Sequence, residues 1–383
     1  MDRRQFFQLS LASAASLLLV DPVDAQPAEP ASATLQVIVS LDEQMLRVYR
    51  GVDEIASSPI SSGRSGHATP TGIFSILDKK TFHRSNIYSN APMPFMQRLT
   101  WSGIALHASG HVPRYPASHG CVRMPERFAR DLFGMTGLHT HVVISARDVR
   151  PRLLEHGLLQ RNVTPAMLLA QQPDLRLSSL PVGVDPIQLA SVETATATDA
   201  PPFQAKFPPR LLITRRAGPD LVRDAQAMLN TLGFDAGETD GYAGRMTIRA
   251  IKGFQVEAGL PVTGTIGAVE RSVLARAVGR PEGMTGHLYA RRSFEPLFDL
   301  PLDAGPETAP LGTHLLIALG GDTYAATSLS PAPALQDTLD GISLPESVFR
   351  YLPPTPLPGA SVVISDGGVW TETGRGTDFI ALT

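Results

Sequence analysis

The chain has 383 residues and nearly balanced charge, with 33 basic against 36 acidic side chains and a formal net charge of −3 at neutral pH. Because no long basic run interrupts that balance, the composition argues against nucleic acid as a partner. A hydrophobic fraction of 43% is enough to build a substantial core, and the length predicts two or three domains.

Residues 1–25 have the features of an export signal. The pair Arg3-Arg4 precedes an apolar stretch from Leu9 to Val20, which is too short to span a bilayer. Small residues at the end of this segment offer a cleavage site. The paired arginines resemble a twin-arginine signal, and Sec export is the alternative. Either route leads out of the cytoplasm, so we expect a periplasmic protein.

Residues 33–148 alternate short apolar strands with turns that contain glycine and proline. Strands are predicted over 35–41, 45–49, 73–77 and 100–106. One amphipathic helix is predicted over 125–133. The segment therefore predicts a mainly antiparallel β domain.

Cys121 is the only cysteine and follows the last of these strands. Since one cysteine forms no internal disulfide, the thiol is either a buried apolar group or a reactive one. Gly120 lets the backbone turn beside the sulfur, and Ser118 and His119 add polar groups. Arg123 adds fixed positive charge. Cations and imidazoles lower a thiol pKa and the thiolate is the reactive form, so these surroundings predict a nucleophile.

The candidate base for this thiol is His107 at the end of the preceding strand, with His111 as the alternative. Zinc is a competing interpretation, since four side chains are possible ligands: His107, His111, His119 and Cys121. The stretch 107–113 contains glycine and proline but no glutamate, so it is a poor match to a metal-binding helix. We therefore expect neither a metal nor another cofactor.

These segments together resemble the L,D-transpeptidases, whose YkuD-type catalytic domain cross-links peptidoglycan. The resemblance covers residues 33–148 and rests on four pieces in the family's order: Thr69–Phe74, Gly103–His107, Ser118–Arg123 and Val142–Ile144. It implies that Cys121 attacks a carbonyl of a stem peptide and that a diaminopimelate amine of another stem resolves the thioester. It also implies that His107 is the base and that the Ala108 carbonyl orients it.

Other residues of the motif have supporting roles in this interpretation. We expect the backbone N–H groups of Gly120 and Cys121 to bind the oxyanion of the tetrahedral intermediate. Ser118 and His119 are expected to shape the turn and to line the acceptor side. Arg123 either binds a stem-peptide carboxylate or holds a loop carbonyl.

The segment before the catalytic strand supplies candidates for the donor cleft. Met93 and Phe95 are predicted to lie on a proline-containing loop that either walls this cleft or packs in the core. Together with Trp101 they resemble a proteobacterial branch of the family that takes the first stem residue as donor, giving 1-to-3 links in place of 3-to-3 links. We treat these three residues as substrate-binding candidates, with His111 as a fourth.

Several outcomes of the same thioester stay open. If water replaces the amine, the enzyme is a hydrolase of the L,D-carboxypeptidase type. If a protein is the acceptor, the reaction attaches an outer-membrane protein to the wall. A peptidoglycan-binding scaffold with an inactive catalytic domain is the alternative that is not an enzyme. The resemblance also implies that carbapenems acylate Cys121.

Residues 149–210 are expected to be a linker with short helices over 153–159 and 165–172. Residues 211–280 then show apolar side chains at helical spacing between glycine-containing loops. They resemble the three-helix peptidoglycan-binding domain through the pieces Gln226–Asn230, Asp240–Gly241 and Gly259–Gly264. This resemblance implies that the domain anchors the protein to glycan or to stem peptide.

Residues 284–383 are predicted to form a β-rich C-terminal segment. Pro310–His314 echoes Pro70–Gly72, and Val362–Asp366 echoes Val142–Ser145. We interpret the segment as a degenerate copy of the catalytic domain that lacks Ser-His-Gly-Cys, and chance similarity of short strands is the alternative. The whole chain is thus expected to be a multidomain α+β protein.

Overall fold

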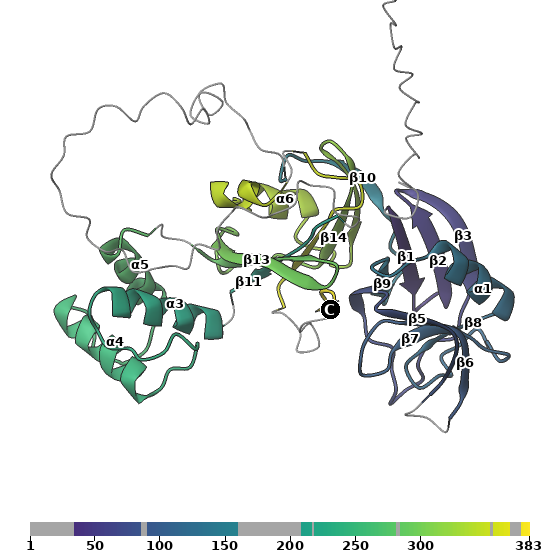
Figure 1. The fold of residues 1–383 in the computed structure, drawn as a ribbon, viewed down its shortest axis with the longest axis horizontal. Helices are drawn as coiled ribbons and strands as arrows, with labels where there is room; N and C mark the ends of the chain where they lie inside the picture. The colour runs from purple at the N-terminus through teal and green to yellow at the C-terminus, as the bar shows by residue number, and fades with distance from the viewer. Residues whose placement is uncertain are drawn as a thin grey trace, which may run out of the picture.

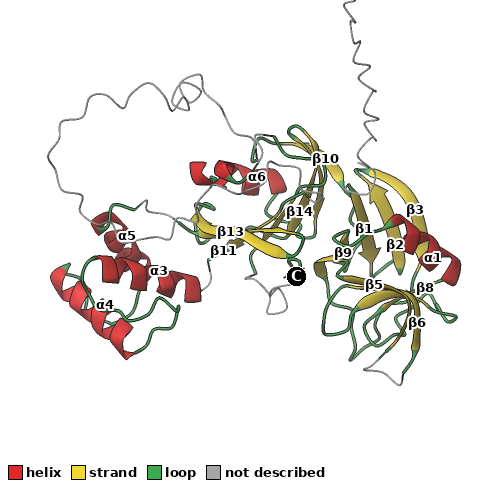
Figure 2. Ribbon diagram, in the orientation of Figure 1, coloured by secondary structure: helices red, strands yellow, loops and turns green. Residues whose placement is uncertain are grey.

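A computed structural model describes residues 34–85, 90–159, 208–216, 218–280, 284–352, 355–367 and 377–383. The export signal, most of the linker and the helix expected over 165–172 lie outside these residues. The structure confirms the multidomain α+β prediction, with a β-sheet catalytic domain, a three-helix region and a β-rich C-terminal sheet (Figure 1, Figure 2). None of the helices in the described ranges is long and apolar enough to cross a membrane.

The first sheet of the catalytic domain has six strands. They are β1 (Leu35–Ser40), β2 (Met45–Arg50), β3 (Asp53–Pro59), β4 (Gly72–Ser75), β9 (His141–Ser145) and β17 (Ala381–Leu382). Their order is β17-β4-β9-β1-β2-β3, and only β1 and β9 run parallel. β1 and β9 are rich in valine and isoleucine and are buried along their whole length, as expected for strands covered on both faces.

The second sheet of the catalytic domain carries the candidate catalytic residues. It consists of β5 (Asp78–Arg84), β6 (Pro92–Arg98), β7 (Ala105–Ala108) and β8 (Val122–Met124), in that order. The helix α1 (Glu126–Met135) follows and buries Ala129 and Leu132 in the core that the two sheets share. β7 and β8 are parallel neighbours. Residues at equivalent positions of these two strands therefore lie side by side.

The C-terminal sheet has seven strands. They are β10 (Arg152–Glu155), β11 (Arg210–Arg215), β12 (Gly286–Arg292), β13 (Glu295–Leu302), β14 (His314–Gly320), β15 (Thr323–Ser328) and β16 (Ser361–Ser365). Their order is β10-β15-β14-β16-β11-β12-β13. The helix α6 (Leu335–Asp340) and the 3-10 helix η1 (Glu346–Arg350) lie between β15 and β16 in the chain.

Two strands of this sheet differ from the sequence-based expectation. β10 forms where a short helix was expected over 153–159, and β11 belongs to this sheet although the helical domain was predicted over 211–280. The reason is the same in both cases, because each segment pairs with a strand more than 70 residues away: β10 with β15, and β11 with β12 and β16. Such distant pairing overrides local propensity.

Five strands of the C-terminal sheet repeat the arrangement of the catalytic sheet. The order β14-β16-β11-β12-β13 corresponds to β4-β9-β1-β2-β3. In both sets the second and third strands run parallel and all other neighbours run antiparallel. A duplicated catalytic sheet would have this arrangement, and the duplication stays a prediction.

The three-helix region is inserted between β11 and β12 (Figure 1). It consists of α3 (Gly218–Thr231), α4 (Arg245–Glu257) and α5 (Ala268–Ala277) around a small apolar core. Gln226 on α3 is buried, and its amide donates to the Asp240 carboxylate at 3.0 Å and to the Thr247 hydroxyl at 3.1 Å. These bonds hold the loop between α3 and α4 against the start of α4.

The catalytic sheet and the C-terminal sheet share an apolar layer. It joins side chains of β1, β4 and β9 to side chains of β11, β14 and β16: Ile38, Ile73, Val143, Leu212, Leu315 and Val363. Two strands also change sheets, because β10 follows β9 but joins the C-terminal sheet, and β17 follows β16 but joins the catalytic sheet. Each sheet is therefore completed by the other half of the chain.

A buried charged group lies in this shared layer. Asp378, which is 2% exposed, pairs with Arg210 on β11 at 2.6 Å and with His139 at 3.9 Å. Arg210 also donates to the Ser75 hydroxyl on β4 at 2.9 Å. Burial raises the pKa of Asp378, but Arg210, His139 and His141 outweigh it and hold that pKa well below its usual range. The carboxylate is thus ionised and links the two sheets.

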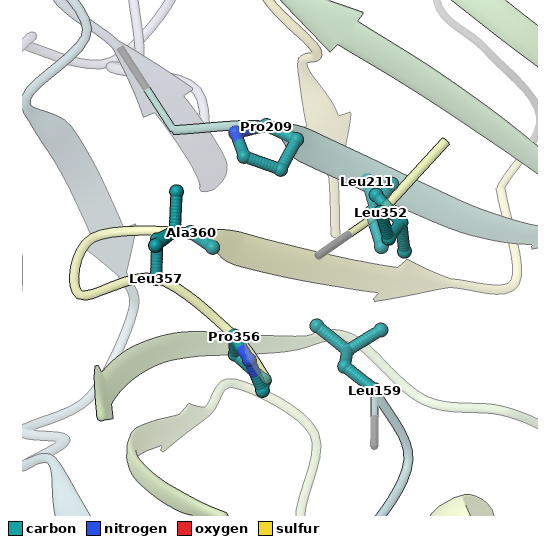
Figure 3. Close-up of a pocket in the computed structure, with 7 residues that line it drawn as sticks. All are labelled: Leu159, Pro209, Leu211, Leu352, Pro356, Leu357 and Ala360. Carbon is teal, nitrogen blue, oxygen red and sulfur yellow. The ribbon is translucent and has the colours of Figure 1, made fainter. Parts of the chain in front are cut away.

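The C-terminal sheet also contains a small apolar pocket, shown in Figure 3. It lies between Leu159, Leu211 and Leu352 and has a volume of about 10 Å³. That volume has room for one water molecule at most, and the lining offers little to hold one. The pocket is therefore a packing defect and not a ligand site.

The substitution Asp378→Asn should destabilise the protein by about 3–5 kcal/mol, because it leaves the buried Arg210 guanidinium without its counter-charge. Denaturant unfolding of the mature protein measures this loss, and the exposed Asp53→Asn on β3 is the matched control. Because the folded pKa of Asp378 is depressed, its contribution is present above about pH 4 and disappears as the pH falls further. Equal stability of the two variants would contradict this role.

Candidate active site

The parallel pairing of β7 with β8 sets the geometry of the candidate active site. Leu106 pairs with Val122 and His107 pairs with Arg123, so Cys121 lies one residue before β8. Cys121 packs against Ala105, and Ala105 shares a face of β7 with His107 because strand side chains alternate. The register therefore places the thiol and the imidazole on the same face of neighbouring strands.

The hydrogen bond of His107 determines which of its nitrogens is the base. His107 is 7% exposed, and its Nδ1 lies 2.8 Å from the Ala108 carbonyl oxygen. A carbonyl only accepts, so Nδ1 carries the proton and Nε2 is left as the acceptor. Burial and the charge of Arg123 together lower the pKa of His107 to about 4, although the hydrogen bond to Ala108 acts in the opposite direction. The imidazole is therefore neutral at physiological pH and able to take a proton.

The Cys121 thiol is protonated in the resting site. Its Sγ donates to the Gly103 carbonyl at 3.3 Å. Burial raises the pKa of the thiol, although Arg123 and Arg98 act in the opposite direction. The expectation that nearby charge lowers this pKa is thus wrong for the resting protein, because desolvation outweighs the cations. The site holds a neutral thiol and a neutral imidazole, so attack requires His107 to remove the proton as the reaction begins.

The backbone around Gly120 is fixed by a closed set of hydrogen bonds. The Ser118 hydroxyl accepts from the Gly120 N–H at 3.1 Å and donates to the Cys121 carbonyl at 2.5 Å. The Thr69 hydroxyl donates to the Gly120 carbonyl at 2.8 Å and accepts from the Gly63 N–H at 2.8 Å. These four bonds make the turn rigid before any substrate binds.

The same bonds determine which N–H group is available for an oxyanion. The Gly120 N–H is occupied by Ser118, so it is not aimed at substrate in this structure. The Gly120 carbonyl is held by Thr69, and a trans peptide points its N–H in the opposite direction. The Cys121 N–H is therefore the better placed donor of the two predicted. Thr69 was noted in the sequence only as part of the Pro-Thr-Gly segment, and its role was missed because that role depends on a contact 51 residues away.

Arg123 lies at the side of a cleft of about 340 Å³ that also includes His107, His111 and Glu126. Within the described residues, no ion pair or side-chain hydrogen bond engages its guanidinium. The alternative in which Arg123 holds a loop carbonyl therefore finds no support there. His111 lies in the same cleft but on an exposed loop outside the strands that hold Cys121 and His107.

His119 contacts two residues of the loop over 61–71, Arg64 and His67. Its Nε2 lies 2.9 Å from Nη2 of Arg64, and its ring contacts the His67 ring edge-on at 4.8 Å. Partial desolvation lowers the pKa of His119, and the charges of Arg64 and His67 lower it further. His119 is therefore neutral at pH 7 and joins the 61–71 loop to the cysteine turn.

The three donor-cleft candidates lie in different environments. Met93 is buried and contacts the same small apolar cluster as Cys121. Phe95 packs edge-on against Phe133 of α1 at 5.9 Å and belongs to the catalytic core, which favours the packing alternative. Trp101 is 51% exposed beside Arg98, at 5.6 Å from its guanidinium. Met93 and Phe95 lie on strand β6, where a loop was expected, and Trp101 is the exposed one of the three.

The described residues contain no group of three or more His, Cys, Asp or Glu side chains arranged to hold a metal ion. In particular, His107 and His119 are engaged by Ala108 and Arg64. The geometry thus offers thiol and imidazole chemistry, with a backbone N–H as the oxyanion donor.

Comparison with known families agrees with this geometry. Residues 35–144 match the profile of the L,D-transpeptidase catalytic domain, the YkuD family, and residues 218–274 match that of a peptidoglycan binding domain. The chain therefore combines a YkuD-type L,D-transpeptidase catalytic domain with a peptidoglycan-binding domain. No curated protein matches the chain.

Solved structures of L,D-transpeptidases are similar to part of the chain. An L,D-transpeptidase from Mycobacterium smegmatis is 19% identical over 30% of this chain and 59% of its own, with a TM-score of 0.28. One from Stackebrandtia nassauensis is 26% identical over 30% of this chain and 56% of its own, with a TM-score of 0.28. The L,D-transpeptidase LdtMt1 in complex with imipenem is 20% identical over 29% of this chain and 58% of its own, with a TM-score of 0.28. The chain thus spans less than two thirds of each of these proteins.

The substitution Gly120→Ala should lower the free energy of unfolding by about 1–2 kcal/mol. Gly120 has φ of +113°, and an added Cβ would lie 2.9 Å from Cδ1 of Ile104. Gly134→Ala in α1 is the control, since nothing lies within 4 Å of its added Cβ. Denaturant unfolding of the mature protein measures the difference, and equal stability of Gly120→Ala and the parent protein would count against a fixed turn.

Alkylation of Cys121 by iodoacetamide should accelerate with pH up to pH 9 without a plateau at neutral pH. The raised pKa keeps the thiol protonated, and a neutral His107 provides no cation to hold a thiolate. At pH 7 the rate should be lower than that of free N-acetylcysteine, whose pKa is about 8.5. A rate that is constant between about pH 5 and pH 8 would indicate a thiolate–imidazolium pair and contradict the neutral resting site.

Proposed function

We propose that the protein is a peptidoglycan L,D-transpeptidase that acts through a thioester on Cys121. The single observation that carries the proposal is the parallel register of β7 and β8, which places Cys121 on the same face as a neutral His107 whose Nδ1 is committed to the Ala108 carbonyl. This arrangement leaves Nε2 as the base beside the thiol. The match of residues 35–144 to the L,D-transpeptidase catalytic domain supports the same reaction.

In the first half of the reaction, Sγ of Cys121 attacks a carbonyl carbon of the donor stem and its proton moves to Nε2 of His107. The oxyanion that forms accepts a hydrogen bond from the Cys121 N–H, which the bond between Thr69 and Gly120 orients. The C–N bond then breaks, and His107 returns the proton to the leaving amine. A thioester remains on the enzyme.

In the second half, an amine of another stem peptide attacks the thioester carbon and gives a proton to His107. The C–S bond breaks, and that proton returns to the sulfur, so the thiol and the neutral imidazole are restored. Arg123, on the wall of the adjoining cleft, is placed to bind a carboxylate of a stem peptide. The net change exchanges one amide for another and needs no cofactor.

The acceptor distinguishes the remaining candidates. A diaminopimelate amine gives a 3-to-3 or a 1-to-3 cross-link, water gives carboxypeptidase activity, and a protein amine gives attachment to the wall. We conclude in favour of transpeptidation because residues 35–144 match the L,D-transpeptidase catalytic domain, and the domain over 218–274 indicates peptidoglycan as the ligand. We propose that residues 1–25, which have the features of an export signal, direct the protein to the periplasm. Carbapenems such as imipenem are the expected covalent inhibitors.

Purified disaccharide-tetrapeptide incubated with the mature protein should yield cross-linked dimers, and Cys121→Ala should yield none. Mass spectrometry detects the dimers, and fragmentation shows whether the first or the third stem residue is the donor. Cleaved monomers without dimers would replace the proposal by a carboxypeptidase. Dimers formed equally by Cys121→Ala would show that this thiol is not the nucleophile.

A further inference from the structure

A tight turn connects β6 to β7 and lies against the reactive sulfur. Its Gly103 N–H donates to the Thr100 carbonyl at 3.2 Å, and its Ile104 N–H donates to the Thr100 hydroxyl at 3.0 Å. Thr100 is fully buried, and its hydroxyl also lies 2.9 Å from the Ser102 hydroxyl. Gly103 has φ of +114°, a conformation that favours glycine. Thr100 therefore holds this turn through both its backbone and its side chain.

The turn directs one backbone N–H toward the sulfur. The Ile104 carbonyl accepts from the N–H groups of Leu99 at 2.8 Å and Thr100 at 3.2 Å, which follow β6. The peptide between Ile104 and Ala105 is trans, so its N–H points in the opposite direction, away from β6 and toward β8. Cys121 directly precedes β8 and packs against the small apolar cluster that includes Ala105. The Ala105 N–H therefore faces Sγ of Cys121.

This N–H distinguishes the two protonation states of the sulfur. Burial raises the pKa of the Cys121 thiol, and the hydrogen bond from the Ala105 N–H is the strongest of the effects that oppose this rise. In the thiol, Sγ donates to the Gly103 carbonyl on the same turn at 3.3 Å. A thiolate has no proton to donate, and a hydrogen bond to a charged acceptor is roughly twice as strong as one between neutral groups. The turn thus offers an acceptor to the thiol and a stronger donor to the thiolate.

We infer that the Ala105 N–H stabilises the Cys121 thiolate and that Thr100 is the positioning residue that holds this N–H in place, an inference that rests on the proposed thioester reaction. As His107 takes the thiol proton, the electron pair left on Sγ accepts a hydrogen bond from this N–H while the C–S bond forms. When the C–S bond breaks in the second half, the same N–H donates to the leaving thiolate until His107 returns the proton. One backbone donor thus serves both halves of the reaction.

NMR of the mature protein tests the contact directly, because the sequence has a single cysteine. With ¹³C-labelled cysteine, the Cβ signal of Cys121 reports ionisation of the thiol, and with ¹⁵N-labelled alanine, the buried Ala105 amide reports its own hydrogen bond. Between about pH 6 and about pH 10 the two signals should change in parallel, with the Ala105 amide proton moving downfield. In Cys121→Ser, whose hydroxyl stays protonated, the Ala105 amide should lack this change. An Ala105 signal that does not follow the thiol would overturn the inference.

Variants of Thr100 test its positioning role. Thr100→Val removes the hydroxyl that holds the Ile104 N–H, so it should raise the pH at which Cys121 ionises and slow alkylation by iodoacetamide at pH 7 about tenfold. Thr100→Ser keeps a hydroxyl and should match the parent protein. Thr338→Val, which removes another buried hydroxyl from α6, is the control and should also match the parent.

A turn that is needed only for folding gives a different result. Thr100→Val would then lower the free energy of unfolding while Cys121 ionises at the same pH as in the parent protein, and this outcome would overturn the inference. If Thr100→Val does not fold, the NMR titration of the parent protein and Cys121→Ser decides alone. Parallel changes of the Cys121 and Ala105 signals in a protein that makes no dimers from disaccharide-tetrapeptide would sustain the thiolate donor and reject the proposed reaction.

Discussion

The ion pair between Arg210 and Asp378 lies where the two large sheets meet, and the architecture of the catalytic half depends on it. Asp378 precedes the short strand β17, which adds itself to the edge of the catalytic sheet beside β4. The contact is close: a Cβ on Gly72, which has φ of +149°, would lie 2.2 Å from the Ala381 carbonyl oxygen. Only glycine fits here, so the Pro-Thr-Gly segment is needed for β17 to pair with β4.

The same segment connects the contact between β4 and β17 to the turn that holds Cys121. Three residues before Gly72, Thr69 holds the Gly120 carbonyl and so fixes the orientation of the Cys121 N–H, the oxyanion donor in the proposed reaction. The reacting groups themselves are neutral at rest, because burial raises the thiol pKa and lowers that of His107 to about 4. Such a site depends on prearranged geometry more than on a preformed thiolate, because the proton must leave the thiol as attack begins. In the proposed reaction, a rigid 61–71 loop is therefore needed to keep the turn at Gly120 and Cys121 in place.

The sequence predicted the parts of the fold and site that are encoded locally. The helix after Cys121 and the three helices of the inserted region follow from local patterns, and the structure has each of them. The bond from His107 to Ala108 was implied by the family resemblance, and the structure has it. The strand expected over 100–106 forms only over Ala105–Ala108, and β6 forms where a loop was expected. β10 and β11 were also missed, because their partner strands lie far along the chain. The role of Thr69 and the raised thiol pKa were missed for a related reason. Both depend on burial and on contacts that the folded chain creates.

Native-state hydrogen exchange of the mature protein, followed through increasing denaturant, tests the central claim that the two sheets and the catalytic turn form one cooperative unit. Peptides covering β4 and β9 and peptides covering β11 and β16 should open with the same free energy and the same denaturant dependence. The 61–71 loop should lose its protection in the same transition. If the C-terminal sheet exchanges while β4, β9 and the loop stay protected, the catalytic domain stands alone and the account is wrong.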